Sequence, residues 1–221
     1  NGTQADEGRC ISAEQSMTSF RLYGHHESGN CLKALWTARY LGLDIEWVEV
    51  DIFKGESRSA AFLALNPAGQ VPVLERSDGR TLAQSNAILT YLAEGSELIP
   101  EDSFDRAKMM EWLFWEQYSH EPTIAVRRSQ MKFHARRADD LDPELYAKGR
   151  RALGVMEMRL LARDFFVAEQ LTLADIALVA YTRVAHEGGF DLAEFPAVQS
   201  WVRRVESALG LPHAADHAMA G

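Results

Sequence analysis

The chain has 221 residues, of which 47% are hydrophobic and 25% are charged, and its net charge is −9. This length accommodates one large or two small domains with a sizeable core, and the acidic balance argues against a nucleic-acid surface, which relies on clustered Lys and Arg. No stretch approaches the roughly 20 consecutive apolar residues of a membrane helix, and the start of the chain shows no secretory signal pattern.

Residues 1–16 are polar and lack periodicity, so we interpret Met17 as the natural start and 1–16 as a tail or an expression remnant. The two cysteines, Cys10 and Cys31, are too far apart for a redox Cys-x-x-Cys motif and too few for a metal framework. This usage indicates a reducing compartment, and we expect the protein in the cytoplasm.

The first part of the chain has the pattern of an α/β unit. Its apolar spacing predicts a strand, a helix, a strand and a short helix, in that order, at 20–23, 32–41, 45–50 and 58–65. A hairpin follows, because two strand patterns at 73–76 and 81–83 flank an Asp-Gly turn. A further helix opens at Gln84-Ser85-Asn86, with Ser85 as the candidate N-cap.

Pro72 lies inside an apolar run, in the segment Asn66–Leu74, where an ordinary central strand would not tolerate it. Either the Val71-Pro72 bond is cis, which leaves the backbone groups of Val71 available to a peptide-like ligand, or a trans proline opens an edge strand. The helix start at Ser85 adds a site suited to a carboxylate, because its first N–H groups have no partner within the helix.

A composition rich in Gly, Ser, Pro and acidic residues at 95–103 indicates a linker, and everything after it has a helical pattern. A long apolar and aromatic helix face includes Trp115 and Tyr118; we assign this face mainly to core and subunit packing, and Pro122 should kink or interrupt it. Further helices are expected at 143–161 and 196–210. Thr172 and Asp175 form a capping-box pattern at the start of a buried helix.

The order of turn, Val-Pro, hairpin and polar-Ser helix start resembles the glutathione-binding half of the cytosolic glutathione transferases. The resemblance implies a cis Pro72, backbone pairing of Val71 with the cysteinyl part of glutathione, and a γ-glutamyl site at Ser85. The implied fold is an α/β thioredoxin-like N-terminal domain with a mixed four-stranded sheet, followed by an all-α C-terminal domain. The expected bounds are 17–94 for the glutathione-binding domain, 95–103 for the linker and 104–221 for the helical domain with the electrophile pocket.

The loop after the first predicted strand holds the candidate chemistry. Only a thiolate is a useful sulfur nucleophile, and a helix start with hydrogen-bond donors lowers a thiol pKa. The pattern Ser28-Gly29-Asn30-x-x-Lys33 resembles bacterial theta-like and nu-like transferases, which implies Ser28 and then Asn30 as contacts of the glutathione sulfur. The alternative for Ser28 is a plain N-cap serine.

Other residues near this pattern receive weaker roles. Cys31 is interpreted as structural, and His25 and His26 as solvated loop histidines without metal-ligand spacing. Gln84 stands where the family usually has Glu, so the charge–charge contact with the γ-glutamyl ammonium is lost. Three cationic residues are candidates for glutathione contacts: Lys54 or Arg58 for the glycine carboxylate, and Arg150. The alternative for each is an ordinary solvated surface charge.

The resemblance therefore implies a dimeric glutathione transferase of detoxification type, with glutathione as co-substrate and no metal or covalently bound cofactor. Its electrophile would lie against the loop after Tyr23 and the helix that carries Trp115 and Tyr118. Two alternatives stay open. One is a glutathione-dependent disulfide reductase or peroxidase of nu-like type, and the other is a non-catalytic binding module, which the Gln84 departure favours.

Overall fold

The computed structural model describes residues 19–214, and the chain divides between Glu101 and Asp102 into two compact units. The expectations for residues 1–16, Met17 and Cys10 lie outside the described residues. The division falls inside the expected linker, whose exact bounds stay a prediction. Each unit is described by itself.

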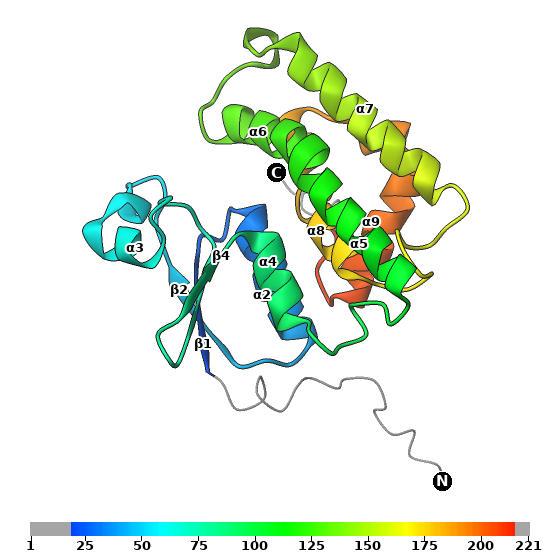
Figure 1. Cartoon of the computed structure of the whole chain (residues 1–221). Coiled ribbons are helices and arrows are strands. Elements are labelled where there is room, and N and C mark those ends of the chain that lie inside the picture. The colour runs from blue at the N-terminus through cyan, green and yellow to red at the C-terminus, as the bar shows by residue number, and fades with distance from the viewer. Residues whose placement is uncertain (1–18, 215–221) are drawn as a thin grey trace. The chain divides into compact units, whose positions relative to one another are not determined.

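Within residues 19–101, the first unit contains a four-stranded mixed sheet with the strand order β2-β1-β3-β4 (Figure 1). Its strands are β1 (Phe20–Gly24), β2 (Ile45–Glu49), β3 (Val73–Arg76) and β4 (Thr81–Ala83). β1 runs parallel to β2 and antiparallel to β3, and β3 and β4 form the antiparallel hairpin. The predicted thioredoxin-like order is thereby confirmed.

The helices of this unit are α2 (Gly29–Tyr40), α3 (Ala60–Leu65) and α4 (Ser85–Leu92), with a 3₁₀ turn, η1 (Glu56–Arg58), before α3. α2 and α4 pack against each other on one face of the sheet, and α3 lies on the other face (Figure 1). Phe62 of α3 packs with Val50 and Val73. Because successive strand residues point to opposite faces, Leu22 and Leu74 face the α2 side, where both are almost fully buried.

Two helix starts differ from the sequence-based expectation. α2 begins at Gly29, three residues before the first apolar residue of the predicted pattern, because Ser28 caps it. The assignment of Ser85 as an N-cap is wrong: Gln84 occupies the cap position and Ser85 is the first helical residue. β4 ends at Ala83, so Gln84 alone makes the change from strand to helix, with φ 71° and ψ 112°.

The second unit is helical, apart from an isolated bridge between Val167 and Gln170, over residues 102–214. Its α-helices are α5 (Ser103–Trp115), α6 (Glu121–Lys132), α7 (Pro143–Leu160), α8 (Leu173–Thr182) and α9 (Pro196–Ala208). A π-helical turn, η2 (Glu116–His120), joins α5 to α6, and short 3₁₀ turns are η3 (Ala138–Asp140), η4 (Ala185–Gly188) and η5 (Leu192–Glu194). The expected all-α second part is confirmed.

Pro122 lies in the first turn of α6, directly after the π-helical turn. A proline is tolerated there because the first N–H groups of a helix have no intrahelical partner. The predicted interruption of the long aromatic helix is thus confirmed.

The buried helix α8 begins with the predicted capping box. The Asp175 carboxylate accepts hydrogen bonds from the backbone N–H and the hydroxyl of Thr172, at 2.9 and 3.0 Å. Its other oxygen accepts from the backbone N–H of Phe166 at 3.0 Å and from the Trp201 indole at 2.9 Å. Burial raises the pKa of this carboxyl to about 6, against the four donors. One side chain therefore joins the start of α8 to the preceding loop and to α9.

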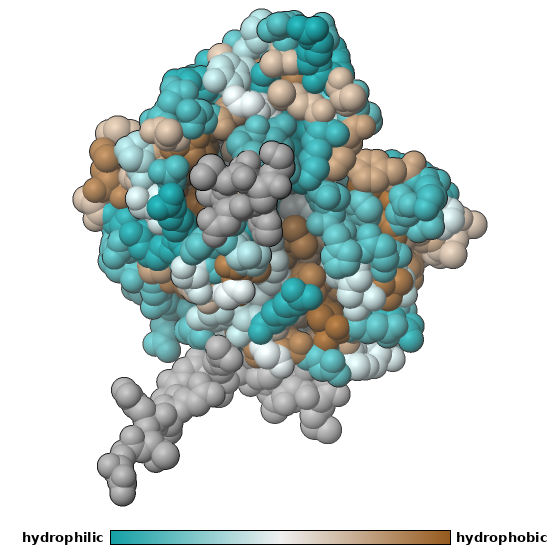
Figure 2. Space-filling view, turned by 180° about the vertical axis from the view of Figure 1, so that it is seen from behind, coloured by the Kyte–Doolittle hydropathy of each residue, from teal (hydrophilic) through white to brown (hydrophobic). Residues whose placement is uncertain are grey.

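The surface carries both hydrophilic and hydrophobic side chains. Figure 2 shows hydrophilic residues over much of one face, with hydrophobic residues between them. The large hydrophobic side chains that remain exposed include Phe104 and Phe114 of α5 and Val155, Met158 and Leu161 in or next to α7. No helix among residues 19–214 combines the length and the apolar character that a membrane crossing requires.

Candidate functional site

The start of α2 holds the candidate sulfur-binding residues. The loop that leads from β1 is fixed by a bond from the Ser28 N–H to the His25 carbonyl, at 2.9 Å. The Ser28 hydroxyl accepts a long hydrogen bond, 3.4 Å, from the backbone N–H of Cys31. A hydroxyl that accepts still has its own hydrogen to donate. Ser28 is therefore an N-cap, and its contact with a ligand sulfur stays a prediction.

Asn30 connects the starts of two helices. Its side-chain oxygen accepts hydrogen bonds from Lys33 Nζ, at 2.8 Å, and from the hydroxyl of Ser85 in α4, at 3.2 Å. Lys33 is fully buried and Ser85 nearly so. Two predicted site residues that are 55 positions apart in the chain thus lie within hydrogen-bond distance. Sequence reasoning named Asn30 and Ser85 separately and gave Lys33 no role.

The start of α4 has the features of an anion site. Gln84 is exposed and holds the left-handed φ of 71°, which side-chain-bearing residues rarely adopt. No side chain of the described residues caps this helix. The positive end of the helix dipole lies at this start, and its binding of a ligand carboxylate stays a prediction.

The peptide bond between Val71 and Pro72 is cis, so the alternative with a trans proline is wrong. The Val71 side chain packs on the Phe62 cluster beside α3. Within residues 19–214, no backbone hydrogen bond uses the N–H or the carbonyl of Val71. Pairing of these two groups with a ligand stays a prediction.

The turn before Val71 is held by polar contacts. The Asn66 side chain donates to the Gln70 carbonyl at 2.7 Å and accepts from the Ala68 N–H at 3.1 Å. Arg58 donates to the Ala68 carbonyl at 3.0 Å. Gly69 has a φ of +62°, and a Cβ built there would lie 2.6 Å from the Arg58 guanidinium. Arg58 thus supports the turn that leads to Val71.

The other two predicted cations also have local partners. Lys54 forms an ion pair with Asp51 at 2.8 Å, and Arg150 of the helical unit pairs with Glu194 at 2.6 Å. Both pairs lie at the surface, where an exchange of partners costs little. Their assignment as glutathione contacts, like that of Arg58, stays a prediction.

Cys31 is fully buried in α2, and burial raises the pKa of its thiol to about 11. The thiolate is the reactive form of cysteine, and it is scarce at neutral pH when the pKa is this high. The geometry therefore agrees with the structural interpretation of this residue.

The prediction that both loop histidines are solvated is wrong for His25. Its Nδ1 lies 2.6 Å from Glu49 Oε1 and its side chain is only 14% exposed. His26 is 61% exposed but stacks on Trp47, at 4.5 Å between ring centroids. Trp47 also donates to Glu49 at 2.7 Å. The signal that could have revealed this cluster is the Trp-x-Glu pattern on the strand parallel to β1.

Partial burial opposes ionisation of Glu49, but the hydrogen bonds from Trp47 and His25 outweigh it and hold the pKa of this carboxyl below its ordinary value. The cluster therefore places a carboxylate beside the two histidines next to the start of α2. Among residues 19–214, no group of three or more His, Cys, Asp and Glu side chains is placed to bind a metal ion.

The two predicted electrophile residues belong to the helical unit. Trp115 ends α5 and meets Trp112 edge to face, with ring centroids 5.1 Å apart. Tyr118 follows in the π-helical turn and is 88% exposed. Their role in electrophile binding stays a prediction.

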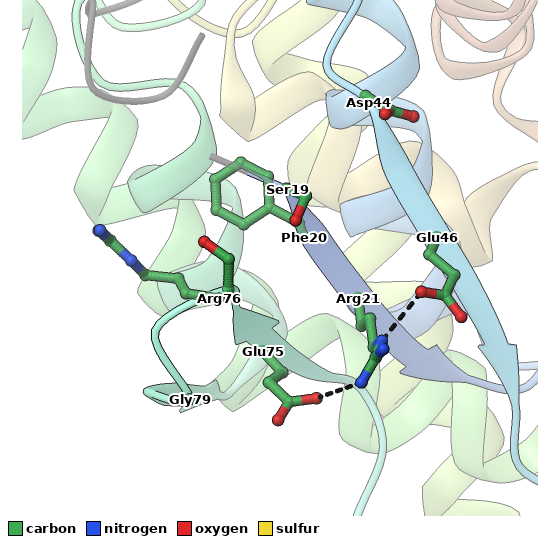
Figure 3. A pocket seen from close by; sticks show the side chains of 9 residues that line it. Ser19, Phe20, Arg21, Asp44, Glu46, Glu75, Arg76 and Gly79 are labelled. Carbon is green, nitrogen blue, oxygen red and sulfur yellow. Dashed lines mark hydrogen bonds and ion pairs between the residues drawn. The ribbon is translucent and has the colours of Figure 1, made fainter. Parts of the chain in front are cut away.

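A separate cavity of about 440 Å³ lies beside β1 and β3 in the first unit (Figure 3). Arg21 projects between two carboxylates on neighbouring strands, at 2.9 Å from Glu46 and 3.7 Å from Glu75 (Figure 3). These charges satisfy one another, so the cavity gives no sign of a ligand class.

Comparison with known proteins gives matches over both units. The family model for the glutathione S-transferase N-terminal domain matches residues 27–94, and the model for the C-terminal domain matches 114–208. The solved structure of a glutathione S-transferase from Pseudomonas fluorescens Pf-5 is 45% identical, with a TM-score of 0.82 over 85% of this chain and 94% of that chain. The structure of Ure2p in complex with glutathione is 27% identical, with a TM-score of 0.79 over 86% of this chain and 96% of that chain.

Curated relatives are more distant and some are longer. Elongation factor 1-gamma of Artemia salina is 29% identical over 73% of this chain, which spans only 37% of that protein. The transcriptional regulator URE2 of Saccharomyces cerevisiae is 26% identical over 87% of this chain, which spans 66% of that protein.

Proposed function

Because this chain belongs to the glutathione S-transferase family, we propose that it binds glutathione as a thiolate and transfers it to small electrophiles. The observation that carries the proposal is a hydrogen bond between the starts of two helices. The Asn30 side chain of α2 accepts it from the Ser85 hydroxyl of α4. This hydrogen bond supports the proposal because it joins the proposed sulfur contact to the proposed carboxylate-binding helix start. The solved structure of Ure2p with glutathione gives further support.

In the proposed complex each part of glutathione has a partner in the first unit. The γ-glutamyl carboxylate lies at the start of α4 with Ser85, and the Gln84 amide oxygen accepts from the ammonium group. The backbone of Val71 pairs with the cysteinyl residue. Lys54 or Arg58 holds the glycine carboxylate, and Arg150 of the helical unit is a further candidate contact.

The chemical step needs the thiolate. A site that lowers the thiol pKa by two units favours the anion by about 2.7 kcal/mol. The Ser28 hydroxyl, the Asn30 amide and the positive end of the α2 dipole are groups that supply such stabilisation. The sulfur then forms a bond to an electrophilic carbon, and the leaving group departs with its electron pair. We assign electrophile binding to Trp115 and Tyr118 of the helical unit.

We test the proposal by isothermal titration with glutathione and by conjugation of a chloronitroaromatic. We expect binding at millimolar glutathione or below, and a loss of kcat of about tenfold or more in Ser28→Ala, since one charge-assisted hydrogen bond is removed. Ser77→Ala, in the exposed hairpin turn, is the matched control and should keep full activity. Failure to bind millimolar glutathione would contradict the proposal at its first step.

Two alternatives lead to different outcomes in the same samples. Reduction of hydroxyethyl disulfide without conjugation would indicate the disulfide reductase, and the burial of Cys31 favours a reaction through glutathione thiols over one through this cysteine. Binding without turnover of either substrate would indicate a non-catalytic module, which the amide at Gln84 favours. We also propose a cytoplasmic homodimer, as the resemblance and the cysteine usage imply.

A further inference from the structure

Lys33 is a buried amino group that the proposed mechanism does not use. It lies in α2 and has 0% exposure, although lysine is among the residues least often buried. Cys31, Ala34 and Leu35 around it in the helix are buried apolar side chains. Burial of an amino group carries a desolvation penalty that an apolar residue would avoid. Packing alone therefore does not account for a lysine at this position.

One contact of Lys33 is with Asn30, the candidate sulfur ligand. Its Nζ donates to Asn30 Oδ1 at 2.8 Å, one helical turn away. A lysine ammonium group has three N–H donors and no acceptor. The Asn30 atom that faces it must therefore be the oxygen and not the nitrogen. The Ser85 hydroxyl donates to the same oxygen at 3.2 Å. Two donors thus fix which way the carboxamide is turned.

The consequence for Asn30 follows from the shape of its side chain. The oxygen and the nitrogen lie on opposite sides of the carboxamide carbon, and the oxygen points to two buried partners, Lys33 and Ser85. The nitrogen, which carries only donors, therefore points away from these two partners. A donor stabilises a thiolate, whereas the flipped amide would present lone pairs and repel it.

We propose that Lys33 is a positioning residue that turns the Asn30 carboxamide so that its N–H groups face the glutathione sulfur. This inference rests on the proposed function. Ser85 shares the task from α4, so the same oxygen also couples the sulfur site to the γ-glutamyl site. The other titratable groups near the start of α2 include Glu27, Glu49 and the histidines His25 and His26 that lie against Glu49.

The first test is Lys33→Met, which keeps the length of the side chain and removes its donor. We expect the pKa of the bound glutathione thiol, followed by thiolate absorbance against pH, to rise by about one unit, which is tenfold less thiolate. kcat at neutral pH should fall by a similar factor, with a smaller change in KM for glutathione. Lys108→Met, on a partly exposed lysine paired with Glu111 at 2.9 Å in α5, is the matched control and should leave both values unchanged.

The second test compares Asn30→Asp with Asn30→Ala and stays informative if Lys33→Met does not fold. The aspartate keeps acceptors for Lys33 and Ser85 but replaces the outward N–H groups by a second acceptor oxygen. We expect the pKa of the bound thiol to rise more in Asn30→Asp than in Asn30→Ala. An equal or smaller rise would show that the N–H groups do not face the sulfur.

The outcomes distinguish a failure of the positioning role of Lys33 from a failure of the transferase proposal. Wild-type protein that binds and ionises glutathione, with the same thiol pKa and kcat in Lys33→Met, overturns the positioning role and leaves the transferase proposal intact. Wild-type protein that binds no glutathione overturns both. A lower kcat in Lys33→Met with an unchanged thiol pKa indicates a structural role only and also overturns the inference.

Discussion

At the scale of single residues, Gln84 stands where the resemblance to the glutathione transferases implies a glutamate. It is exposed at the start of α4, and its amide offers an oxygen acceptor without charge. We predict that Gln84→Glu tightens glutathione binding by about fivefold to tenfold, because a charge-assisted contact with the ligand ammonium contributes about 1 kcal/mol more than a neutral one. Isothermal titration measures the change in Kd.

The matched control for this prediction is a change in the ligand. N-acetylated glutathione has no ammonium group, so Gln84→Glu should not improve its binding. An equal gain for both ligands would mean that the new carboxylate acts on the fold of the loop and not on the γ-glutamyl end.

A second prediction concerns Cys31. Because burial raises the pKa of its thiol to about 11, it should stay protonated and unreactive at neutral pH in the folded protein. We predict that Cys10→Ser protein, whose remaining cysteine is Cys31, reacts with a disulfide reagent only after unfolding in denaturant. Rapid labelling of the folded variant would contradict the structural assignment of this residue.

Residue types, spacing and the family resemblance named Ser28, Asn30 and Ser85 as candidates, because the pattern around a helix start is local, and their roles stay predictions. The partners of these residues were not predictable in the same way. Ser85 reaches Asn30 only through the packing of α2 against α4, and Lys33, although it is one helical turn from Asn30, was given no role. His25 was assigned to solvent because its partner Glu49 lies on another strand.

At the scale of elements, two glycines of α7 form a matched pair. A Cβ on Gly149 would lie 2.4 Å from Phe190 Cζ, whereas a Cβ on Gly154 meets nothing within 4 Å. We predict that Gly149→Ala lowers the free energy of unfolding by about 1–3 kcal/mol through overpacking. Gly154→Ala should raise it by up to about 1 kcal/mol, as alanine favours helix. Urea unfolding measures both, and equal effects would contradict the close packing of α7 on Phe190.

The start of α8 predicts a pH dependence. Burial raises the pKa of Asp175 from 3.8 to about 6, so the folded state favours the protonated carboxyl. The stability from this group is fully present below about pH 4 and is lost as the pH rises through 6, a change of about 3 kcal/mol. We predict that the stability difference between wild type and Asp175→Asn shrinks by this amount from pH 4 to pH 7, as measured by urea unfolding.

The subtraction of the Asn variant removes the titration of other carboxylates. Glu187, whose pKa is lowered by Lys132 and Arg128 despite its partial burial, has the opposite dependence and loses stability as the pH falls. A difference that grows with pH would show that the four donors to Asp175 outweigh its burial.

Element types were predictable where local chemistry decided them, as at the hairpin, at Pro122 and at the capping box of α8. Element ends were less so. α2 starts three residues before its first apolar position because a serine cap, and not hydrophobicity, sets the start. The N-cap of α4 was misassigned because the general preference for Ser was applied, whereas the backbone at Gln84 makes the turn with no side-chain cap from the described residues.

At the scale of the whole molecule, the strand order and the division into an α/β and a helical unit followed from the alternation of patterns along the chain. That alternation does not show which apolar side chains of a helix stay exposed at the protein surface. Phe104 and Phe114 of α5 are 70% and 68% exposed, which is unusual for large aromatic side chains and is typical of interaction surfaces.

We predict that the protein in solution has twice the mass of the 24.8 kDa chain, and that Phe114→Glu shifts it toward the monomer. A buried charge without a partner weakens an interface, which light scattering after size exclusion detects. Val155→Glu, on an exposed apolar residue of α7, is the matched control and should stay dimeric. Monomeric wild type at micromolar concentration would contradict the proposed homodimer.

The φ of 71° at Gln84 has a consequence for anyone who engineers this protein for heat resistance. Such a conformation in a residue with a side chain costs about 1–3 kcal/mol, and glycine would relieve it. A thermostability screen should therefore select Gln84→Gly, but this change removes the amide that we propose as the acceptor for the ligand ammonium group. Protein stability and ligand binding therefore favour different residues at position 84.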